Sequence, residues 1–234
     1  MTAVSDPTPQ RRDPEPGVVL PEELAPLRER LRRQRILEVV KRLFDLLAAA
    51  AGLLLFLPLL PFLALMVKLE SPGPLFFRQV RIGRDGRPFD CFKIRSMVSD
   101  AEAIKARYAH LNEADGAAFK IRQDPRITRV GRFVRRSSLD EFPQLFNVLR
   151  GDMSIVGPRP QIPSEVAEYR PDQMARLLVK PGITCLWQIS GRNDVDFEEW
   201  MRLDREYVER RSLGLDFSIL LRTLPAVIAR RGAY

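Results

Sequence analysis

The longest apolar stretch of the chain runs from Leu46 to Val67 and contains no charged residue. As a straight helix, its 22 residues would rise about 33 Å, which is enough to cross the hydrocarbon core of a bilayer. A buried helix of a soluble protein is seldom apolar on every side over so many turns. The stretch therefore predicts insertion into a membrane.

Prolines and flanking charges indicate how the stretch enters the membrane. Pro58 and Pro61 interrupt it, and each removes an internal hydrogen bond and bends a helix. Arg42 precedes the stretch, and Lys68 follows it with several arginines further on, so the positive-inside rule assigns both ends to the cytoplasm. We predict a re-entrant membrane helix over residues 43–70, which enters and leaves on one face. A plain transmembrane span is the alternative.

The segment before this helix, residues 23–42, interleaves apolar residues with six arginines and one lysine. The pattern predicts a basic amphipathic helix. We expect it to lie on anionic lipid, where each cation contributes roughly 1 kcal/mol; a solvated helix face is the alternative. Residues 1–22 are rich in proline and charge, which is typical of a disordered tail.

Alternating apolar and polar positions after the membrane helix predict a β-hairpin, with strands at Phe77–Ile82 and Phe89–Ile94. Helical patterns follow at Ser99–His110, at Leu139–Arg150, at 163–178 with an interruption at Pro171, at Phe197–Arg211 with Asp196 as cap, and at 216–231 with a break at Pro225. The fold class is therefore α+β. Residues 71–234 form one cytoplasmic domain in which some helices lie at the membrane interface.

The charge balance narrows the class of partner. Lysine and arginine number 38 against 30 acidic residues, which gives a net charge of +8 at pH 7 and suits a phosphorylated substrate, anionic lipid or nucleic acid. A single histidine, His110, excludes a histidine-rich metal site, and two cysteines are too few for a disulfide scaffold or a four-cysteine zinc site. We expect no nucleic-acid partner, because it would leave the apolar stretch unexplained and because no reading helix or aromatic stacking motif is recognisable.

Adjacent carboxylates, Asp140 and Glu141, stand at the predicted start of a helix, and five arginines lie between residues 126 and 136. One interpretation is that the carboxylates only cap the helix and complement its dipole, for roughly 0.3–1 kcal/mol each. The other interpretation is that the carboxylates take part in catalysis. Arginines and free backbone N–H groups make an anion site, in which an ionised Asp140 attacks a phosphoryl group. Glu141 then holds Mg²⁺ together with the substrate phosphates.

Several long motifs in order give the chain a resemblance to a known family. The segment SSLDEFPQLFNVLRGDMSIVGPRP, with DPRITRVGRFVRR before it and KPGITCLWQISGR after it, closely resembles the bacterial sugar transferases, the monotopic phosphoglycosyl transferases. The likeness begins at about Lys41, reaches the C-terminus and includes the proline-broken apolar helix. One departure is Cys185, where many relatives have glycine.

This resemblance implies an activity and two substrates. Family members transfer a sugar-1-phosphate from a nucleoside diphosphate sugar, usually a UDP-sugar, to a polyprenyl phosphate such as undecaprenyl phosphate, and they release UMP. The step begins the assembly of exopolysaccharide, capsule or glycoprotein glycans. The implied architecture is a small monotopic catalytic domain on the cytoplasmic face of the inner membrane, with membrane lipids among its partners. A non-catalytic membrane-bound scaffold is the alternative, and the oligomeric state, a homo-oligomer included, stays open.

Residue roles follow from the same resemblance. Asp140 is implied as the nucleophile that attacks the β-phosphate and carries the phosphosugar, and Glu141 is linked to Mg²⁺, with Asp140 beside it. Arg135 and Arg159 are implied as phosphate binders. We place six further residues in the substrate-binding set: Lys93, Arg95, Arg132, Gln144, Asn147 and Asp152.

Overall fold

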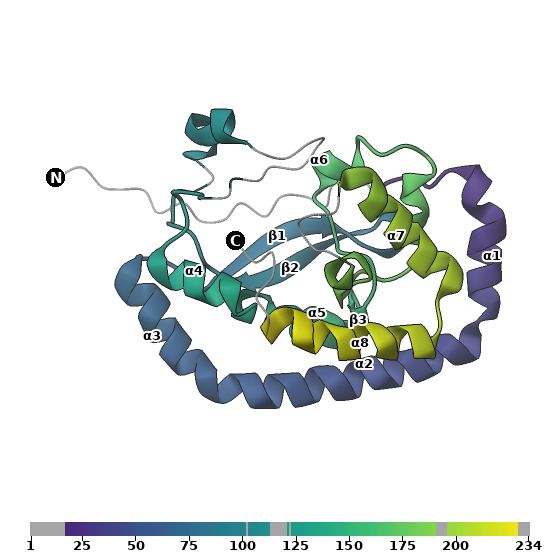
Figure 1. The fold of residues 1–234 in the computed structure, drawn as a ribbon, viewed down its shortest axis with the longest axis horizontal. Coiled ribbons are helices and arrows are strands. Elements are labelled where there is room, and N and C mark those ends of the chain that lie inside the picture. The colour runs from purple at the N-terminus through teal and green to yellow at the C-terminus, as the bar shows by residue number, and fades with distance from the viewer. Residues whose placement is uncertain (1–16, 102, 113–120, 122, 191–195, 229–234) are drawn as a thin grey trace.

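The computed structural model describes residues 17–101, 103–112, 121, 123–190 and 196–228, and it combines helices with two small sheets (Figure 1). The α-helices of the described residues are α1 (Ala25–Arg33), α2 (Arg35–Phe56), α3 (Leu60–Glu70), α4 (Arg129–Arg136), α5 (Gln144–Arg150), α6 (Pro163–Val166), α7 (Phe197–Arg210) and α8 (Leu213–Ile228). The strands are β1 (Phe76–Ile82), β2 (Pro88–Ile94), β3 (Ser154–Val156) and β4 (Gly182–Thr184). This mixed architecture agrees with the predicted α+β class.

The three N-terminal helices form a bent frame around one side of the domain (Figure 1). The inner side of α2 is buried at intervals of three to four residues, at Lys41, Asp45, Ala49, Leu53 and Phe56. These residues face the rest of the protein, with α2 packed on α5. Because the buried positions repeat with the helical period, one side of α2 is available to the protein core and the other to the surroundings.

The bend expected from the two prolines is present. A 3₁₀ turn at Leu57–Leu59 separates α2 from α3. Pro58 lies in the first turn of this segment and Pro61 in the first turn of α3, where the missing N–H removes no internal hydrogen bond. The continuous stretch Arg35–Glu70 is long and apolar enough to cross a membrane.

Buried charges fasten α2 to the domain. Lys41 Nζ donates to Asp216 Oδ2 at 2.6 Å and to Val156 O at 3.1 Å. Asp45 Oδ1 accepts from the backbone N–H of Ile155 at 3.0 Å. Buried charges persist only when they are paired and hydrogen-bonded, so these contacts hold the helix in one position.

The predicted basic helix at 23–42 differs from the structure in two respects. The segment is divided between α1 and the start of α2, which separate at Gln34. Lys41 and Arg42, expected on anionic lipid, point into the protein instead, and Arg42 donates to the carbonyls of Val148 and Leu149 at 2.6 and 2.8 Å. Arg42, which caps the end of α5, and Lys41, which pairs with Asp216, are therefore not available to lipid.

The predicted hairpin is confirmed, with β1 antiparallel to β2. An asparagine of α5 anchors it. Asn147 is fully buried, its Oδ1 accepts from Phe92 N at 3.1 Å, and its Nδ2 donates to Asp90 O at 2.6 Å. This amide fixes the position of α5, and of the turn before it, relative to the hairpin.

Two glycines allow close backbone contact beside the parallel pair β3–β4. A Cβ on Gly157 would lie 2.4 Å from Lys180 O, and a Cβ on Gly182 would lie 2.1 Å from Gly157 N. Such distances leave room only for glycine. The Gly-Pro-Arg-Pro segment, residues 157–160, is therefore held against β4.

Two of the predicted helical features after the hairpin are confirmed. Asp196 caps α7, and its Oδ1 accepts from Glu199 N at 2.8 Å. Pro171 lies between α6 and a 3₁₀ segment at Gln173–Leu178, as the predicted interruption requires.

Two other helix predictions are wrong. Among the described residues of Ser99–His110 the chain forms turns and a 3₁₀ segment that extends over Lys105–Leu111, and no described side chain there is buried. Without an apolar face to pack, an α-helix gains little. In α8 the helix continues through Pro225 to Ile228 instead of breaking, and residues 229–231 lie outside the described part.

Part of the segment expected to be a disordered tail has defined contacts. Residues 1–16 of the predicted tail lie outside the described residues. Residues 17–22 are placed against the hairpin turn, where Val18 N donates to Gly86 O at 3.0 Å. This part of the predicted tail is therefore ordered.

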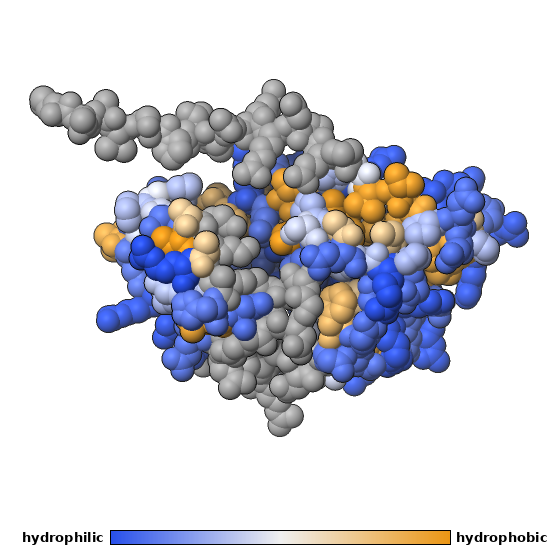
Figure 2. Space-filling view, turned by 90° about the horizontal axis from the view of Figure 1, so that it is seen from above, coloured by the Kyte–Doolittle hydropathy of each residue, from blue (hydrophilic) through white to orange (hydrophobic). Residues whose placement is uncertain are grey.

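Exposed apolar residues concentrate on the outer side of the frame. They include Leu47, Leu54, Phe62, Leu65 and Leu69, all more than half exposed. Figure 2 shows the molecule from above, where the coloured surface is hydrophilic towards both ends and carries a hydrophobic area between them. An exposed apolar surface along two consecutive helices indicates a partner or a membrane.

Candidate active site

Asp140 and Glu141, the dyad, lie in a single 3₁₀ turn at Leu139–Glu141. The chain enters this turn through Ser138, whose φ of 57° is left-handed and therefore uncommon for a residue other than glycine. Pro143 follows as the N-cap of α5, so the α-helix begins later than predicted. The dyad thus occupies a tight turn just ahead of a helix.

Two cations from separate segments converge on the dyad. Lys93, in β2, places Nζ 3.3 Å from Glu141 Oε1 and 4.0 Å from Asp140 Oδ2. Arg159, in the Gly-Pro-Arg-Pro segment, donates from Nη2 to Glu141 Oε1 at 2.6 Å. The four side chains are between 11% and 28% exposed. A charged group that contacts them is therefore partly shielded from water. Charge interactions are stronger in such a shielded place than in water.

A third cation, Arg135, reaches the dyad from α4. Its Nε donates to Ser96 Oγ at 2.7 Å, and its charge lowers the pKa of Asp140 against the effect of burial. The close approach of α4 depends on Gly131, because a Cβ there would lie 1.9 Å from Ser96 O. The glycine allows α4 to bring Arg135 to the site.

The two carboxyl groups have opposite pKa shifts. Burial, with the negative charge of Glu141, raises the pKa of Asp140 to about 6, although Lys93, Arg135 and Arg159 oppose the shift. Burial also acts on Glu141, but the charges and hydrogen bonds of Arg159 and Lys93 outweigh it and lower its pKa to about 2. Glu141 is therefore ionised at neutral pH. Asp140 becomes a carboxylate as the pH rises through about 6, so above that pH it is an anion able to attack phosphorus.

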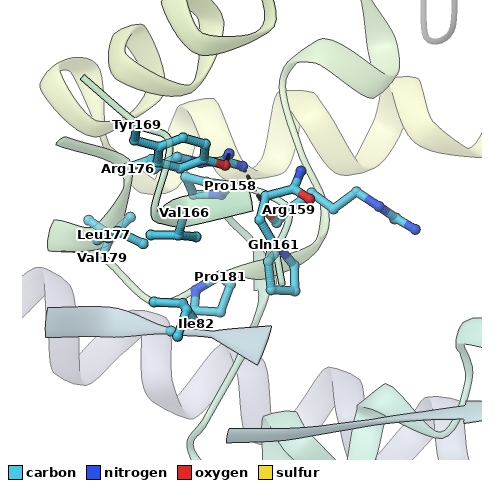
Figure 3. A pocket seen from close by; sticks show the side chains of 12 residues that line it. Ile82, Pro158, Arg159, Gln161, Val166, Tyr169, Arg176, Leu177, Val179 and Pro181 are labelled. Carbon is cyan, nitrogen blue, oxygen red and sulfur yellow. Dashed lines mark hydrogen bonds between the residues drawn. The ribbon is translucent and has the colours of Figure 1, made fainter. Parts of the chain in front are cut away.

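A buried arginine supports the loop that carries Arg159. Arg176 donates from Nη2 to Arg159 O and from Nη1 to Tyr169 OH, both at 2.6 Å, and its Nη2 lies 2.8 Å from Asp204 Oδ2. The Arg159 side chain points away from this cluster (Figure 3). The cavity that the cluster lines measures about 10 Å³, room for about one water. The loop is thus braced from behind while its guanidinium meets Glu141.

Two predicted substrate-binding residues have other surroundings. Arg95 is buried, and it donates to Ser71 O and Pro72 O at 2.5 Å, so it holds the turn that follows α3. Arg132 lies on the exposed side of α4. The structure does not bring either of them to the dyad.

The remaining three predicted substrate-binding residues belong to α5 or follow it. Asn147 is engaged with the hairpin backbone, as described above. Asp152 lies past the end of α5, where it accepts from Asn147 Nδ2 at 3.3 Å and pairs with Arg150 at the same distance. Gln144 is 2% exposed in the first turn of α5 and therefore packs inside the domain. Of the predicted set, Lys93 and Arg159 contact the dyad, and Arg135 lies near enough for its charge to act on Asp140.

Two site residues were not singled out by sequence analysis. Arg81 Nη1 donates to Pro160 O at 3.1 Å, and burial with the nearby charge of Arg159 lowers the pKa of Arg81. Strand alternation offered a signal, because the hairpin register places Arg81 and Lys93 on the same face. Arg176 had no local signal, since its partners lie 7 to 28 residues away along the chain.

The dyad fits a magnesium site by its chemistry. Mg²⁺ commonly binds one or two carboxylates and completes its shell with water and substrate phosphates. Asp140 and Glu141 supply two adjacent carboxyl groups, and the described residues contain no group of three or more potential metal ligands. These two residues would hold the ion together with a diphosphate.

Comparison with known proteins gives consistent matches. The family model for bacterial sugar transferases matches residues 36–230. The chain is 45% identical over 199 residues to the UDP-galactose-lipid carrier transferase of Erwinia amylovora, which covers 83% of this chain and 42% of that protein. It is 42% identical over 200 residues to the exopolysaccharide production protein ExoY of Rhizobium meliloti, and the match covers 84% of this chain and 88% of that protein. It is also 44% identical over 204 residues to the UDP-glucose:undecaprenyl-phosphate glucose-1-phosphate transferase of Caulobacter vibrioides, and the match covers 83% of this chain and 72% of that protein. The chain thus spans less than half of the Erwinia protein.

Proposed function

The chain belongs to the bacterial sugar transferase family, and we propose that it transfers a sugar-1-phosphate from a UDP-sugar to a polyprenyl phosphate such as undecaprenyl phosphate. One observation carries the proposal: Lys93 and Arg159 converge on a dyad in which Asp140 is an ionisable carboxylate. The names of the similar proteins, which refer to UDP-linked sugars and undecaprenyl phosphate, support the same two substrates.

The geometry supports a two-step displacement at phosphorus. A carboxylate oxygen of Asp140 attacks the β-phosphorus of the UDP-sugar, an acyl–phosphate bond forms, and the bond to UMP breaks. A phosphate oxygen of the polyprenyl phosphate then attacks the same phosphorus and displaces Asp140. No proton has to move in either step. Arg159 and Lys93 stabilise the negative charge that accumulates on the phosphoryl oxygens.

Each side chain around the dyad has a part in this scheme. Glu141 stays ionised and orients Lys93 and Arg159 through its Oε1 contacts. Arg135 adds a third positive charge near Asp140. Asp140 and Glu141 would hold Mg²⁺ together with the diphosphate, and the ion would supply a positive counter-charge for the phosphates.

The dyad is linked directly to the apolar frame. Phe142, which follows Glu141, stacks on Phe56 at the end of α2 with ring centroids 4.7 Å apart and an interplanar angle of 21°. The bend of the frame and the reacting carboxylates are therefore neighbours. This contact suits an acceptor whose phosphate lies at the membrane surface and whose chain lies in the bilayer.

We propose that the frame is a re-entrant membrane element and that the domain lies on the cytoplasmic face. The support comes from contacts at the start of α2. Glu38 accepts from Arg84 in the hairpin turn at 3.3 Å and pairs with Arg211 after α7. In a helix that crossed the membrane, this end could not contact the domain that follows the other end.

Cysteine accessibility tests the topology. Arg35→Cys and Arg87→Cys, each in a background without Cys91 and Cys185, place thiols on exposed positions before and after the apolar stretch. We expect both thiols to be protected from an impermeant maleimide in intact cells and labelled after lysis. Labelling of Arg35→Cys from outside, with Arg87→Cys protected, contradicts re-entry and establishes a span.

Arg159→Ala is expected to lower kcat/KM for the UDP-sugar by about 10- to 100-fold, because a charge-assisted hydrogen bond is worth about 1.5–3 kcal/mol. Arg159→Lys is expected to recover only part of the loss, since an ammonium cannot match phosphate with a planar fork. Steady-state kinetics of the two variants make the comparison. Full recovery by lysine contradicts the guanidinium role.

The activity itself is tested by UMP release. Purified protein is incubated with each member of a UDP-sugar panel that includes UDP-glucose and UDP-galactose, with and without undecaprenyl phosphate, and both UMP and lipid-linked sugar are measured. We expect lipid-linked product with at least one donor of the panel. Failure of every donor, with folded protein in membranes, favours the non-catalytic scaffold.

A further inference from the structure

The outward side of α4 carries a row of cations that the proposed reaction does not use. Arg129, Arg132, Phe133 and Arg136 are all exposed, and their spacing places them on one side of the helix. With Ser137 they line a shallow hollow of about 200 Å³. Phe133, which lies among these arginines, is 52% exposed. We call these four residues the α4 face.

The arginine side chains of the α4 face form no ion pair within the described part of the chain, although the Glu70 carboxylate at the start of α4 lies close enough to Arg129 for their charges to interact. The exposed arginines of α7 behave differently, since Arg205 pairs with Glu209 at 2.8 Å and Arg210 pairs with Glu206 at 2.7 Å. Guanidinium groups that form no ion pair, Arg132 and Arg136 above all, give this hollow a surface complementary to anionic groups.

The α4 face lies beside the apolar frame. Glu70, the last residue of α3, accepts from Arg129 N and Val130 N, both at 2.7 Å, and so joins α3 to the start of α4. Figure 1 shows the two helices as neighbours at one end of the molecule. On α3, Phe62 and Leu69 are 69% and 78% exposed. A cationic face next to exposed apolar residues has the pattern of a protein segment at headgroup depth.

We propose that the α4 face binds the phosphate of anionic phospholipid headgroups, with Phe133 entering the boundary of the acyl chains. The inference rests on the proposed membrane association and adds a lipid partner to it. Phosphate oxygens accept paired hydrogen bonds from guanidinium groups, and the exposed phenyl ring favours a lipid over a soluble polyanion. It adds α4 to the basic segment 23–42 as a contact for anionic lipid, since Arg30, Arg32, Arg33 and Arg35 of that segment are exposed while Lys41 and Arg42 point inward.

The location gives this contact a consequence for the site. Arg135 lies on the same helix and faces the dyad, while the α4 face points outward. A helix held by headgroups on one side and bonded to Ser96 on the other sets the height of Asp140 above the bilayer. Anionic lipid would therefore bind the enzyme and also position the dyad relative to a lipid-linked acceptor.

The test compares two variants with equal changes of charge. Arg132→Gln/Arg136→Gln removes two unpaired cations of the α4 face, and Arg205→Gln/Arg210→Gln removes two paired cations from α7. Each full-length protein is synthesised without detergent in the presence of vesicles. The vesicles contain phosphatidylcholine alone or equal parts of phosphatidylcholine and phosphatidylglycerol. Flotation over a range of lipid concentrations gives an apparent partition coefficient, and thermal melting of the purified proteins checks folding.

We expect the wild-type protein to bind both vesicles, and to bind those with phosphatidylglycerol about tenfold more tightly or better, with the excess reduced by salt. The α4 variant should lose most of this excess and keep its binding to phosphatidylcholine, while the α7 variant keeps both. Retention of the excess by the α4 variant, or an equal loss in the α7 variant, overturns the inference. Absence of wild-type binding to either vesicle would instead overturn the proposed membrane association.

Discussion

Asp140→Asn is expected to abolish sugar-phosphate transfer while the protein stays folded. The amide has nearly the same shape as the carboxylate but cannot form the acyl–phosphate bond. The expected loss in kcat is more than about 1,000-fold, comparable with losses at the nucleophiles of other covalent enzymes. Transfer of labelled sugar-phosphate to undecaprenyl phosphate, measured with purified protein, gives the comparison.

The control for this variant is Asp172→Asn, the same chemical change at an exposed aspartate. Asp172 lies between α6 and the 3₁₀ segment at Gln173–Leu178 and pairs with Arg170 at 3.3 Å. We expect it to keep activity within a few-fold of wild type, since surface ion pairs contribute little. Activity above a few per cent of wild type in Asp140→Asn would remove Asp140 as the nucleophile. Equal losses in both variants would point to an effect that is not specific to the dyad.

The second large effect is expected for Glu141→Gln, which should lower kcat by about 100-fold or more. Glu141 is held ionised by Arg159 and Lys93, which meet at its Oε1 at 2.6 and 3.3 Å. A neutral amide cannot neutralise two cations, so both lose their common anchor. The dyad also loses a carboxylate for Mg²⁺. Kinetics at several Mg²⁺ concentrations should show a weaker dependence on Mg²⁺ together with the lower kcat.

Chelation provides the matching measurement on the unchanged protein. We expect EDTA to stop transfer and added Mg²⁺ to restore it, because two substrate phosphates and two carboxylates in one site require a counter-charge. Full activity in the chelator contradicts a metal role for the dyad. A variant Glu141→Gln with wild-type activity would contradict the anchoring role of this carboxylate for Lys93 and Arg159.

Local patterns were sufficient for several elements. The apolar stretch with Pro58 and Pro61 predicted a bent helix, and the bend lies at Leu57–Leu59. Strand alternation predicted the hairpin, and Asp196 predicted the start of α7. In each case the signal lies in neighbouring residues: a missing N–H, a period of two, or a side chain that caps its own helix.

Contacts between distant segments could not be predicted in the same way. Lys41 looked like a lipid-facing cation, but its partner Asp216 lies 175 residues further along the chain. Asn147 resembled a substrate ligand within a polar motif, yet it serves the backbone of β2. The segment at Ser99–His110 has helical composition, but its described side chains find no core to pack against. Tertiary contacts decided these cases, and propensity did not.

The candidate site shows the same division. The local pattern of charges pointed to the dyad and the motif resemblance pointed to the dyad and Arg159, and the structure brings them together with Lys93. Arg176, which braces the Arg159 loop, depends on Tyr169 and Asp204 from other segments. The residues proposed to meet substrate lie in recognisable motifs, whereas a residue that positions one of them, such as Arg176, is identified only by the fold.

The covalent intermediate on Asp140 is the central claim, and intact-protein mass spectrometry tests it most directly. Purified protein is mixed with a UDP-sugar that supports transfer, Mg²⁺ and no acceptor, quenched, and compared with Asp140→Asn treated in the same way. The account predicts a gain equal to one sugar-phosphate with release of UMP, mapped by peptide analysis to Asp140 and absent from the variant. Efficient transfer without any adduct, or an adduct on another residue, would contradict it.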